Sequence, residues 1–318
     1  MKHHRLSFYF NYRKKTGKRG FSLLKKVSHD VVSEFVGTAF EFLCRIHVCK
    51  PYLVVRVDGG ICSQMNQYLL GQIYAQRGEN VLYDLTWYEK VGMDVDGRFV
   101  RTFELEEMFP DIHVQTLGKL KRWFYRTFLM YVSADRNQPD LSASVSPTYF
   151  GGYYDIDDDF FSEQFDRLFN NNVKRSKAPD VLKLASSNQF SCAVHVRRGD
   201  LARGDNPWYG GVADDYFFRA IEYVERLHPQ TRFFFFSDEM VYVKTNIVPN
   251  LSVDYVLIQE TNKAFEDLLL ISKCDIIVAS QGSFGKYAAM LNRNSMLVLC
   301  DNEYAKPWLT RKKNVVLL

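Results

Sequence analysis

The feature that most constrains the fold is a regular alternation, between residues 190 and 299, of short apolar runs with amphipathic segments. The apolar runs predict strands at 190–196, 232–236, 252–258, 276–279 and 296–299. The amphipathic segments predict helices at 215–227, 264–274 and 283–291. Strands that alternate with helices in this way form a parallel sheet with right-handed crossovers. We therefore predict an α/β fold for the second half of the chain.

The first half opens with a similar unit. Residues 52–57 predict a strand, 58–64 a tight turn with two glycines, and 65–77 a helix. The turn lacks G-x-G-x-x-G, so a dinucleotide site is not indicated. The predicted boundaries follow from these patterns and from the polar stretch 170–179. They divide the chain into three parts, which are a basic arm with an amphipathic helix at 1–50, an N-terminal domain at 51–175 and a C-terminal domain at 176–318.

Basic charge is concentrated at the N-terminus. The chain carries a net charge of +4, but residues 1–26 hold nine Lys or Arg and no acidic residue, so the remainder is acidic. Apolar residues then recur at helical spacing between Leu24 and Phe42. This pattern predicts either contact of residues 1–45 with an anionic membrane or a helix packed on the domain surface. The acidic body argues against nucleic acid as a partner.

Cysteine usage and hydropathy bear on the compartment. The six cysteines form no C-x-x-C pair and no cluster with zinc spacing, which favours a reducing compartment. No apolar run reaches the roughly 20 residues of a membrane span, and the pattern of a signal peptide is absent. We predict a cytoplasmic protein, peripherally attached to the inner face of the cytoplasmic membrane.

The strand at 190–196 leads directly into charged residues. His195, Arg197, Arg198 and Asp200 follow or end this apolar run, and ligands of open α/β sheets bind at the carboxyl ends of strands. Paired guanidiniums suit a diphosphate because each can bind two oxygens. The alternative is a surface salt bridge between Arg198 and Asp200. We therefore predict that these side chains converge on a ligand.

Two further strand ends carry polar residues. Ser280 follows a predicted strand, and Ser283 and Phe284 open a predicted helix whose free N–H groups would attract an anion. Asp238 ends the strand at 232–236, where a carboxylate could accept from ribose hydroxyls or from guanine, or could cap the next helix. With Arg197 and Arg198, the segment 280–284 is predicted to form a second wall for a pyrophosphate, or else an ordinary capped helix.

Several carboxylates are candidates for proton transfer or for metal binding. Asp200, Asp205 or His195 could act as general base toward an acceptor hydroxyl. The acidic clusters at 94–96 and 155–159 could hold Mg²⁺ or Mn²⁺, but such loops are commonly only solvated.

Several motifs together resemble one family. Residues 195–200, His-Val-Arg-Arg-Gly-Asp, resemble the H-x-R-R-x-D signature of α-1,2- and α-1,6-fucosyltransferases. Residues 59–68 are similar to G-G-L-G-N-Q-M-F-Q-Y of the α-1,2 enzymes, glycosyltransferase family 11. Similar likenesses to that family's motifs occur at 149–154, 236–239 and 266–284. The resemblance covers 52 to about 310 in the family's order, and it departs from the pattern at Ser63, Asn66 and Lys286-Tyr287.

The resemblance implies a GT-B-like α/β fold with two facing Rossmann-like domains and parallel sheets. It also implies GDP-fucose as donor, inversion at the anomeric carbon and no cofactor or obligatory metal. Donor contacts would come from Arg197, Arg198 and Asp238, and from Ser280, Ser283 and Phe284. An acceptor or second-wall loop would include Gly60, Gln64 and Asn66. The position of Asp205, ten residues after His195, matches the base of the α-1,6 relatives, and Asp200 would hold the arginine loop.

The function predicted is transfer of fucose from GDP-fucose to the 2-hydroxyl of a galactoside in a glycan or O-antigen-like repeat unit. The alternatives are a metal-dependent transferase of another sugar that uses residues 94–96, and a glycan- or nucleotide-binding protein without catalysis.

Overall fold

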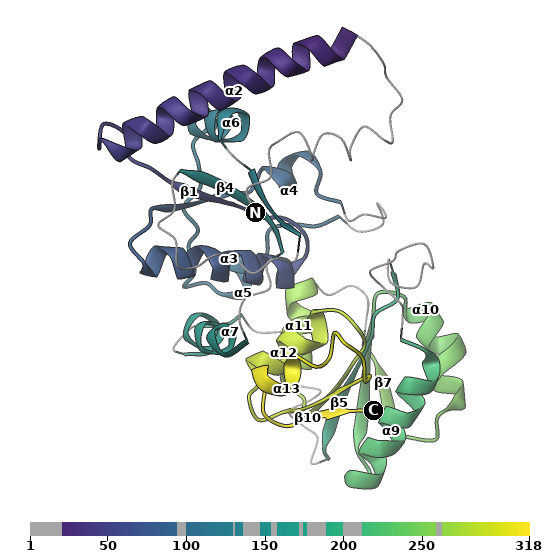
Figure 1. Ribbon diagram of the computed structural model, residues 1–318. Coiled ribbons are helices and arrows are strands. Elements are labelled where there is room, and N and C mark those ends of the chain that lie inside the picture. The colour runs from purple at the N-terminus through teal and green to yellow at the C-terminus, as the bar shows by residue number, and fades with distance from the viewer. Residues whose placement is uncertain are drawn as a thin grey trace. The chain divides into compact units, whose positions relative to one another are not determined.

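The computed structural model describes residues 21–93, 100–129, 131–135, 147–153, 158–171, 174–176, 189–199, 212–258 and 263–318. The chain divides into two compact units, and Figure 1 follows it through both. Unit 1 holds the described residues 21–93, 100–103 and 113–153. Unit 2 holds the described residues 104–112 and 158–318.

Unit 1 is built on a parallel sheet with the strand order β2-β1-β4-β3. The strands are β1 (Leu53–Arg56), β2 (Val81–Asp84), β3 (Tyr131–Asp135) and β4 (Thr148–Tyr153). The helices are α2 (Phe21–Arg45), α3 (Ile61–Gln76), α4 (Thr86–Lys90) and α6 (Lys119–Phe128). Strand β2 ends at Asp84, whose carboxylate accepts the backbone N–H of Thr86, the residue that begins α4.

The long helix α2 packs on α6 within unit 1. The rings of Phe40 and Phe124 meet edge to face with centroids 4.9 Å apart. Gly37 allows this approach, because a Cβ there would lie 2.5 Å from the carbonyl oxygen of Phe128. This contact agrees with the predicted helix packed on a domain surface. Among the described residues, no helix has the length and apolarity required to cross a membrane.

Unit 2 is built on a parallel sheet of six strands with the order β10-β9-β8-β5-β6-β7. The strands are β5 (Ser191–Val196), β6 (Arg232–Ser237), β7 (Tyr255–Leu257), β8 (Ile276–Ala279), β9 (Met296–Leu299) and β10 (Val315–Leu317). The longer helices are α7 (Asp158–Phe165), α9 (Asp214–Leu227), α11 (Ala264–Ile271) and α12 (Phe284–Leu291). Shorter helical segments are α5 (Leu105–Met108), α10 (Met240–Tyr242), α13 (Trp308–Arg311), the π-helices at 166–170 and 243–247, and a 3₁₀ turn at 248–250.

The strand order of unit 2 is that of a doubly wound sheet. The chain runs outward from β5 through β6 to β7, returns to β8 beside β5, and runs outward again to β10. The carboxyl ends of β5 and β8 therefore flank the topological switch point, where ligands of such sheets bind. The parallel α/β architecture predicted for this half is confirmed.

The sheet of unit 2 is buried on both faces. All six residues of β5 are buried, and so are the four consecutive phenylalanines of β6. Cys192, Val194 and Val196 pack with Tyr216 and Val224 of α9. The opposite face of β5 carries His195, which stacks on Phe284 of α12. Figure 1 shows α9 on one side of the sheet and α11 and α12 on the other.

The division between the units differs from the predicted boundary at 175/176. Helix α7 and the π-helix that follows it belong to unit 2. Phe161 and Phe165 are buried against Tyr287 of α12, with centroids 5.9 and 5.5 Å from its ring. The polar stretch near 175 lies downstream of this aromatic contact, which is why composition alone misplaces the boundary.

Candidate active site at the carboxyl edge of the second sheet

The ends of three neighbouring strands are tied together where the switch point lies. The hydroxyl of Ser237 donates to the carbonyl oxygen of Val196 at 2.8 Å, which joins β6 to β5. The backbone N–H of Arg197 donates to Oγ of Ser280 at 2.9 Å, which joins β5 to the residue after β8. Ser280 is buried and acts here as an acceptor. The predicted convergence of strand ends is therefore present, and Ser280 fixes the backbone that carries the arginines.

Asp238 anchors both arginines. Its Oδ1 accepts the backbone N–H of Arg198 at 2.9 Å, and its Oδ2 forms an ion pair with the guanidinium of Arg197. A Cβ on residue 199 would lie 2.6 Å from Oδ2, so the close approach requires Gly199. Asp238 caps no helix, since Glu239 is the N-cap of α10. The helix-cap alternative for Asp238 is thus corrected, and its carboxylate holds the arginine loop.

Arg198 is held differently. Its guanidinium carbon lies 3.5 Å from the centroid of the Tyr242 ring. Asp214 and Glu239 each lie 3.9 Å from a guanidinium nitrogen, which is outside hydrogen-bond distance. Nε of Arg198 is buried and has no hydrogen-bond partner among the described residues. The guanidinium is therefore fixed by stacking and by charge, and Nε is left uncommitted.

His195 is buried rather than displayed at a cleft. Only 7% of the residue is exposed, and its ring stacks on Phe284 with centroids 5.1 Å apart. Burial, together with the smaller effect of the nearby charge of Arg197, lowers the pKa of His195 to about 3. The imidazole is therefore neutral at pH 7. Its Nδ1 has no hydrogen-bond partner in the described part of the chain. A buried ring with so low a pKa is a poor proton acceptor, which argues against His195 as the general base.

The amino end of α12 supplies backbone donors beside β8. Ser283 is its N-cap, as predicted, but no hydrogen bond from its side chain caps the helix. Gly282 precedes it with φ +113°, a conformation that favours glycine. The N–H groups of the first helical turn have no intrahelical acceptor and carry partial positive charge. Phe284 contributes packing against His195 rather than a polar contact.

The loop residues predicted in unit 1 hold their own turn. Gly60 is the N-cap of α3. Gln64 and Asn66 are each 1% exposed, and Nε2 of Gln64 donates to the carbonyl oxygen of Thr102 at 2.9 Å. Gln64 therefore stabilises the turn within unit 1, and the acceptor or second-wall loop of Gly60, Gln64 and Asn66 stays a prediction.

The remaining candidates lie outside the described residues. Asp200 and Asp205 are among them, as are the cluster at 94–96 and most of the cluster at 155–159. Within the described ranges, no group of three or more His, Cys, Asp or Glu side chains is arranged to hold a metal ion.

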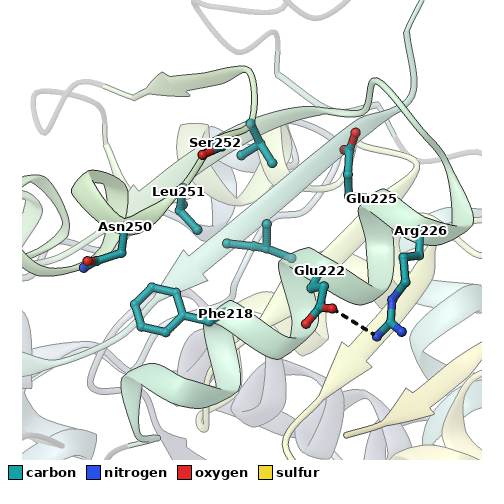
Figure 2. A pocket seen from close by; sticks show the side chains of 9 residues that line it. Phe218, Glu222, Glu225, Arg226, Asn250, Leu251 and Ser252 are labelled. Atoms are coloured by element: carbon teal, nitrogen blue, oxygen red, sulfur yellow. Dashed lines mark ion pairs between the residues drawn. The ribbon is translucent and has the colours of Figure 1, made fainter.

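A pocket elsewhere in unit 2 is apolar. Figure 2 shows it between α9 and the segment 250–253, with Phe218 and Leu251 among the lining residues. Glu222 and Arg226 form an ion pair at 3.7 Å beside it. None of the predicted site residues lines this pocket, so the charged edge of the sheet is the better candidate for the chemistry.

Three side chains near Arg198 were not predicted from the sequence. Asp214, Glu239 and Tyr242 surround Arg198. Glu239 lies within the motif at 236–239, but nothing in the sequence relates Asp214 or Tyr242 to Arg198. They come together only because α9 and α10 both pack beside β6.

Comparison with known proteins identifies the class of protein. Alpha-1,2-colitosyltransferase of Escherichia coli is 23% identical over 82% of this chain and 93% of its own length. Galactoside 2-alpha-L-fucosyltransferase SEC1 of Bos taurus is 31% identical over 34% of this chain and 30% of its own. The structure of the fucosyltransferase NodZ from Bradyrhizobium aligns with 80% of this chain and 95% of its own, with a TM-score of 0.51 and 14% identity. This likeness concerns the fold, and the predicted GT-B-like class with parallel sheets is confirmed.

The chain is therefore a glycosyltransferase. The sequence profile of glycosyl transferase family 11 matches residues 114–317, which is more than half of the chain. The chain belongs to this family, as the motifs at 59–68 and 195–200 predicted.

Proposed function

We propose that this enzyme transfers fucose from GDP-fucose to the 2-hydroxyl of a galactoside, with inversion at the anomeric carbon. The observation that carries the proposal is the Arg198 guanidinium at the carboxyl edge of β5, which stacks on Tyr242 and, among the described residues, meets carboxylates at 3.9 Å. A guanidinium in this state suits an incoming diphosphate. Membership of family 11 and the name of the bovine relative support fucose as the sugar and a galactoside as the acceptor.

The described residues suggest how the leaving group is stabilised. Negative charge develops on the β-phosphate as the bond to the sugar breaks. Arg198 would bind its oxygens, while Arg197, held by Asp238, and the amino end of α12 contribute positive potential. These groups would neutralise the leaving diphosphate without a metal ion, and the proposal includes none.

The acceptor proton requires a base on the opposite side of the sugar, because inversion places the attacking and leaving oxygens on opposite faces. Asp214 and Glu239 lie beside Arg198, on the leaving-group side, and do not suit this role. Asp205 therefore stays the proposed base, with Asp200 as the second choice. Both lie outside the described residues.

A second donor is favoured by one comparison. The relative matched over 93% of its own length is an alpha-1,2-colitosyltransferase. Colitose is fucose that lacks the 3-hydroxyl, so the same diphosphate contacts would serve either sugar. Residues that contact the sugar would discriminate between the two donors, whereas the arginines would not.

The test is a donor panel with the purified full chain. GDP-fucose, GDP-colitose, GDP-mannose and UDP-galactose are each incubated with galactoside acceptors, and release of GDP or UDP is measured. We expect turnover with GDP-fucose and an α-1,2-linked product by NMR. Preference for GDP-colitose would correct the sugar and keep the diphosphate site. Turnover with UDP-galactose alone, or with no donor, would contradict the proposal.

We further propose that α2 attaches the enzyme to an anionic membrane, where a surface polysaccharide repeat unit is assembled on a lipid carrier. Val32, Phe35, Phe42 and Leu43 lie along one side of α2, because the last three follow Val32 by 3, 10 and 11 positions, which is helical spacing. All four are exposed, with Phe35 75% and Phe42 60% accessible. The side that carries Phe40 is the one packed on α6. The apolar side is preceded in the sequence by the basic residues 1–26, whose charge is complementary to anionic lipid.

Vesicle sedimentation tests this attachment. The full chain is mixed with vesicles of phosphatidylcholine alone or with added phosphatidylglycerol, and we expect binding to the anionic vesicles that weakens with salt. A Phe35→Asp/Phe42→Asp variant should bind about tenfold more weakly, because it removes two apolar side chains from the lipid contact. Leu309→Asp, at an exposed position of α13, serves as the matched control. Equal binding of both variants, or none by the wild type, would contradict the proposal, as would a dimer that the α2 variant dissociates.

A further inference from the structure

We propose that Tyr242 is a positioning residue for donor binding, and that it holds the Arg198 guanidinium flat against its ring with the N–H edge available to the diphosphate. The inference rests on the proposed function, since it concerns the same donor. It adds a residue that neither the sequence motifs nor the strand ends indicate.

The geometry is that of a stacked cation–π pair. A distance of 3.5 Å from the guanidinium carbon to the ring centroid is van der Waals contact. Stacking covers one face of the guanidinium and leaves its N–H groups, which lie in the guanidinium plane, free to donate. A carboxylate partner at hydrogen-bond distance would instead occupy those N–H groups.

The two arginines illustrate this difference. Arg197 is held by an ion pair with Asp238. Among the described residues, Arg198 pairs with the carboxylates of Asp214 and Glu239 at 3.9 Å, and its Nε has no hydrogen-bond partner. Stacking therefore orients Arg198 without using the donors that a phosphate needs.

Tyr242 is itself held in place. Its hydroxyl donates to Oδ2 of Asp214, the first residue of α9, at 2.6 Å. Burial and the bond to Asp214 raise the pKa of Tyr242, so the phenol keeps its proton at neutral pH. Its neighbour Met240 and the following Val243 are buried in the core of unit 2. The ring is thus fixed both by a hydrogen bond and by the backbone that carries it.

Binding of GDP and turnover of GDP-fucose test the role with three variants of Tyr242. Tyr242→Leu removes the ring and should raise the Kd for GDP and the KM for GDP-fucose about tenfold, with a smaller change in kcat. Tyr242→Phe keeps the ring and should restore both values to within about threefold of the wild type. Tyr242→Met provides a second ring-free variant if Tyr242→Leu folds poorly. Tyr255→Leu, on the exposed edge strand β7, is the control and should change neither.

A double-mutant cycle separates positioning from a general structural effect. In an Arg198→Ala background, removal of the Tyr242 ring should have no further effect on the Kd for GDP, because its partner is gone. An equal effect in both backgrounds would overturn the inference, as would unchanged GDP binding by Tyr242→Leu. If the wild type binds no GDP, the proposed donor fails instead, so the two failures are distinguishable.

Discussion

Both sheets of this enzyme carry charged side chains at their carboxyl edges, but these side chains differ in burial and in hydrogen bonding. In unit 1, Asp84 ends β2 and is only 2% exposed. Its Oδ1 accepts the N–H of Thr86 at 2.9 Å and the Thr86 hydroxyl, and its Oδ2 accepts the hydroxyl of Tyr149 at 2.8 Å. In unit 2, the Arg198 side chain is 26% exposed and relies on stacking. A charge at a strand end is therefore not by itself a sign of a ligand site.

The difference lies in how many hydrogen bonds the protein itself satisfies. A buried carboxylate with three donors is a structural group, because removal of it would leave those donors unpaired. Burial would raise the pKa of Asp84, but the hydrogen bonds from Thr86 and Tyr149 outweigh it and lower the pKa below its usual value. An arginine whose N–H groups are not all bonded to protein acceptors contributes less to the fold, and these groups can bind a ligand.

The largest expected effect is on activity, at Arg198. Arg198→Lys should lower kcat/KM for GDP-fucose roughly 100- to 1,000-fold, because an ammonium cannot bind two oxygens as a planar fork does. The melting temperature should stay close to that of the wild type, since the described contacts of the side chain are stacking and pairs at 3.9 Å. Arg226→Lys, in an exposed ion pair of α9, is the control. Near-normal turnover would mean that the guanidinium is not needed.

The next effect is on stability, at Asp84. Asp84→Ala should destabilise the protein by about 3 kcal/mol, because it removes the buried carboxylate that accepts the hydroxyls of Thr86 and Tyr149. Chemical denaturation measures the change. Glu89→Ala, exposed and 3.7 Å from Arg122, should change stability by less than about 0.5 kcal/mol. If Asp84→Ala were as stable as the control, the contrast between the two strand ends would be lost.

The pH dependence gives a second view of Asp84. Its folded pKa lies below the unfolded value, so the ionised form stabilises the fold above the unfolded pKa of about 3.9 and this stability is lost as pH falls through the folded pKa. The stability difference between the wild type and Asp84→Asn should therefore be full near pH 6 and shrink toward pH 3. A difference that is constant over this range would show that the charge of Asp84 contributes nothing.

The sequence was sufficient for the fold of unit 2 but not for all of its site. Strands β5, β6, β8 and β9 are short apolar runs between helices, so the local sequence pattern is enough to predict them. Strands β3 and β4 carry no such pattern and were missed; they are fixed by pairing with β1 and with each other. Arg197, Arg198 and Ser280 were found because the ends of parallel strands meet at one edge.

The residues that were misread or missed depend on tertiary contacts. Gln64 and Asn66 look available in a glycine-rich turn, but both side chains are buried, and Gln64 donates to the carbonyl oxygen of Thr102. Tyr242 and Asp214 are separated by more than 25 residues and meet only in the folded unit. Polarity in a sequence does not tell whether a polar group will find its partner inside the protein.

A smaller effect is expected at Tyr149. Tyr149→Phe removes one of the three donors to Asp84 and should cost about 1 kcal/mol. Tyr255→Phe, on the edge strand β7, is the matched control with no expected change. In an Asp84→Ala background the cost should vanish, because the acceptor is gone. Full cost in both backgrounds would show that Tyr149 stabilises unit 1 independently of Asp84.

The smallest expected effect is that of excess EDTA on turnover, which should be none. In the proposed mechanism, Arg198 and the amino end of α12 neutralise the leaving diphosphate. The carboxylates of Asp214 and Glu239 then lie beside the guanidinium, each at 3.9 Å, and need no metal ion. Loss of activity in EDTA with recovery in Mn²⁺ would reverse this interpretation, because carboxylates beside the diphosphate would then be candidates for metal ligands. The contrast with Asp84 would become one between a structural carboxylate and carboxylates that bind a metal, and the role of Arg198 would have to be measured again with the metal present.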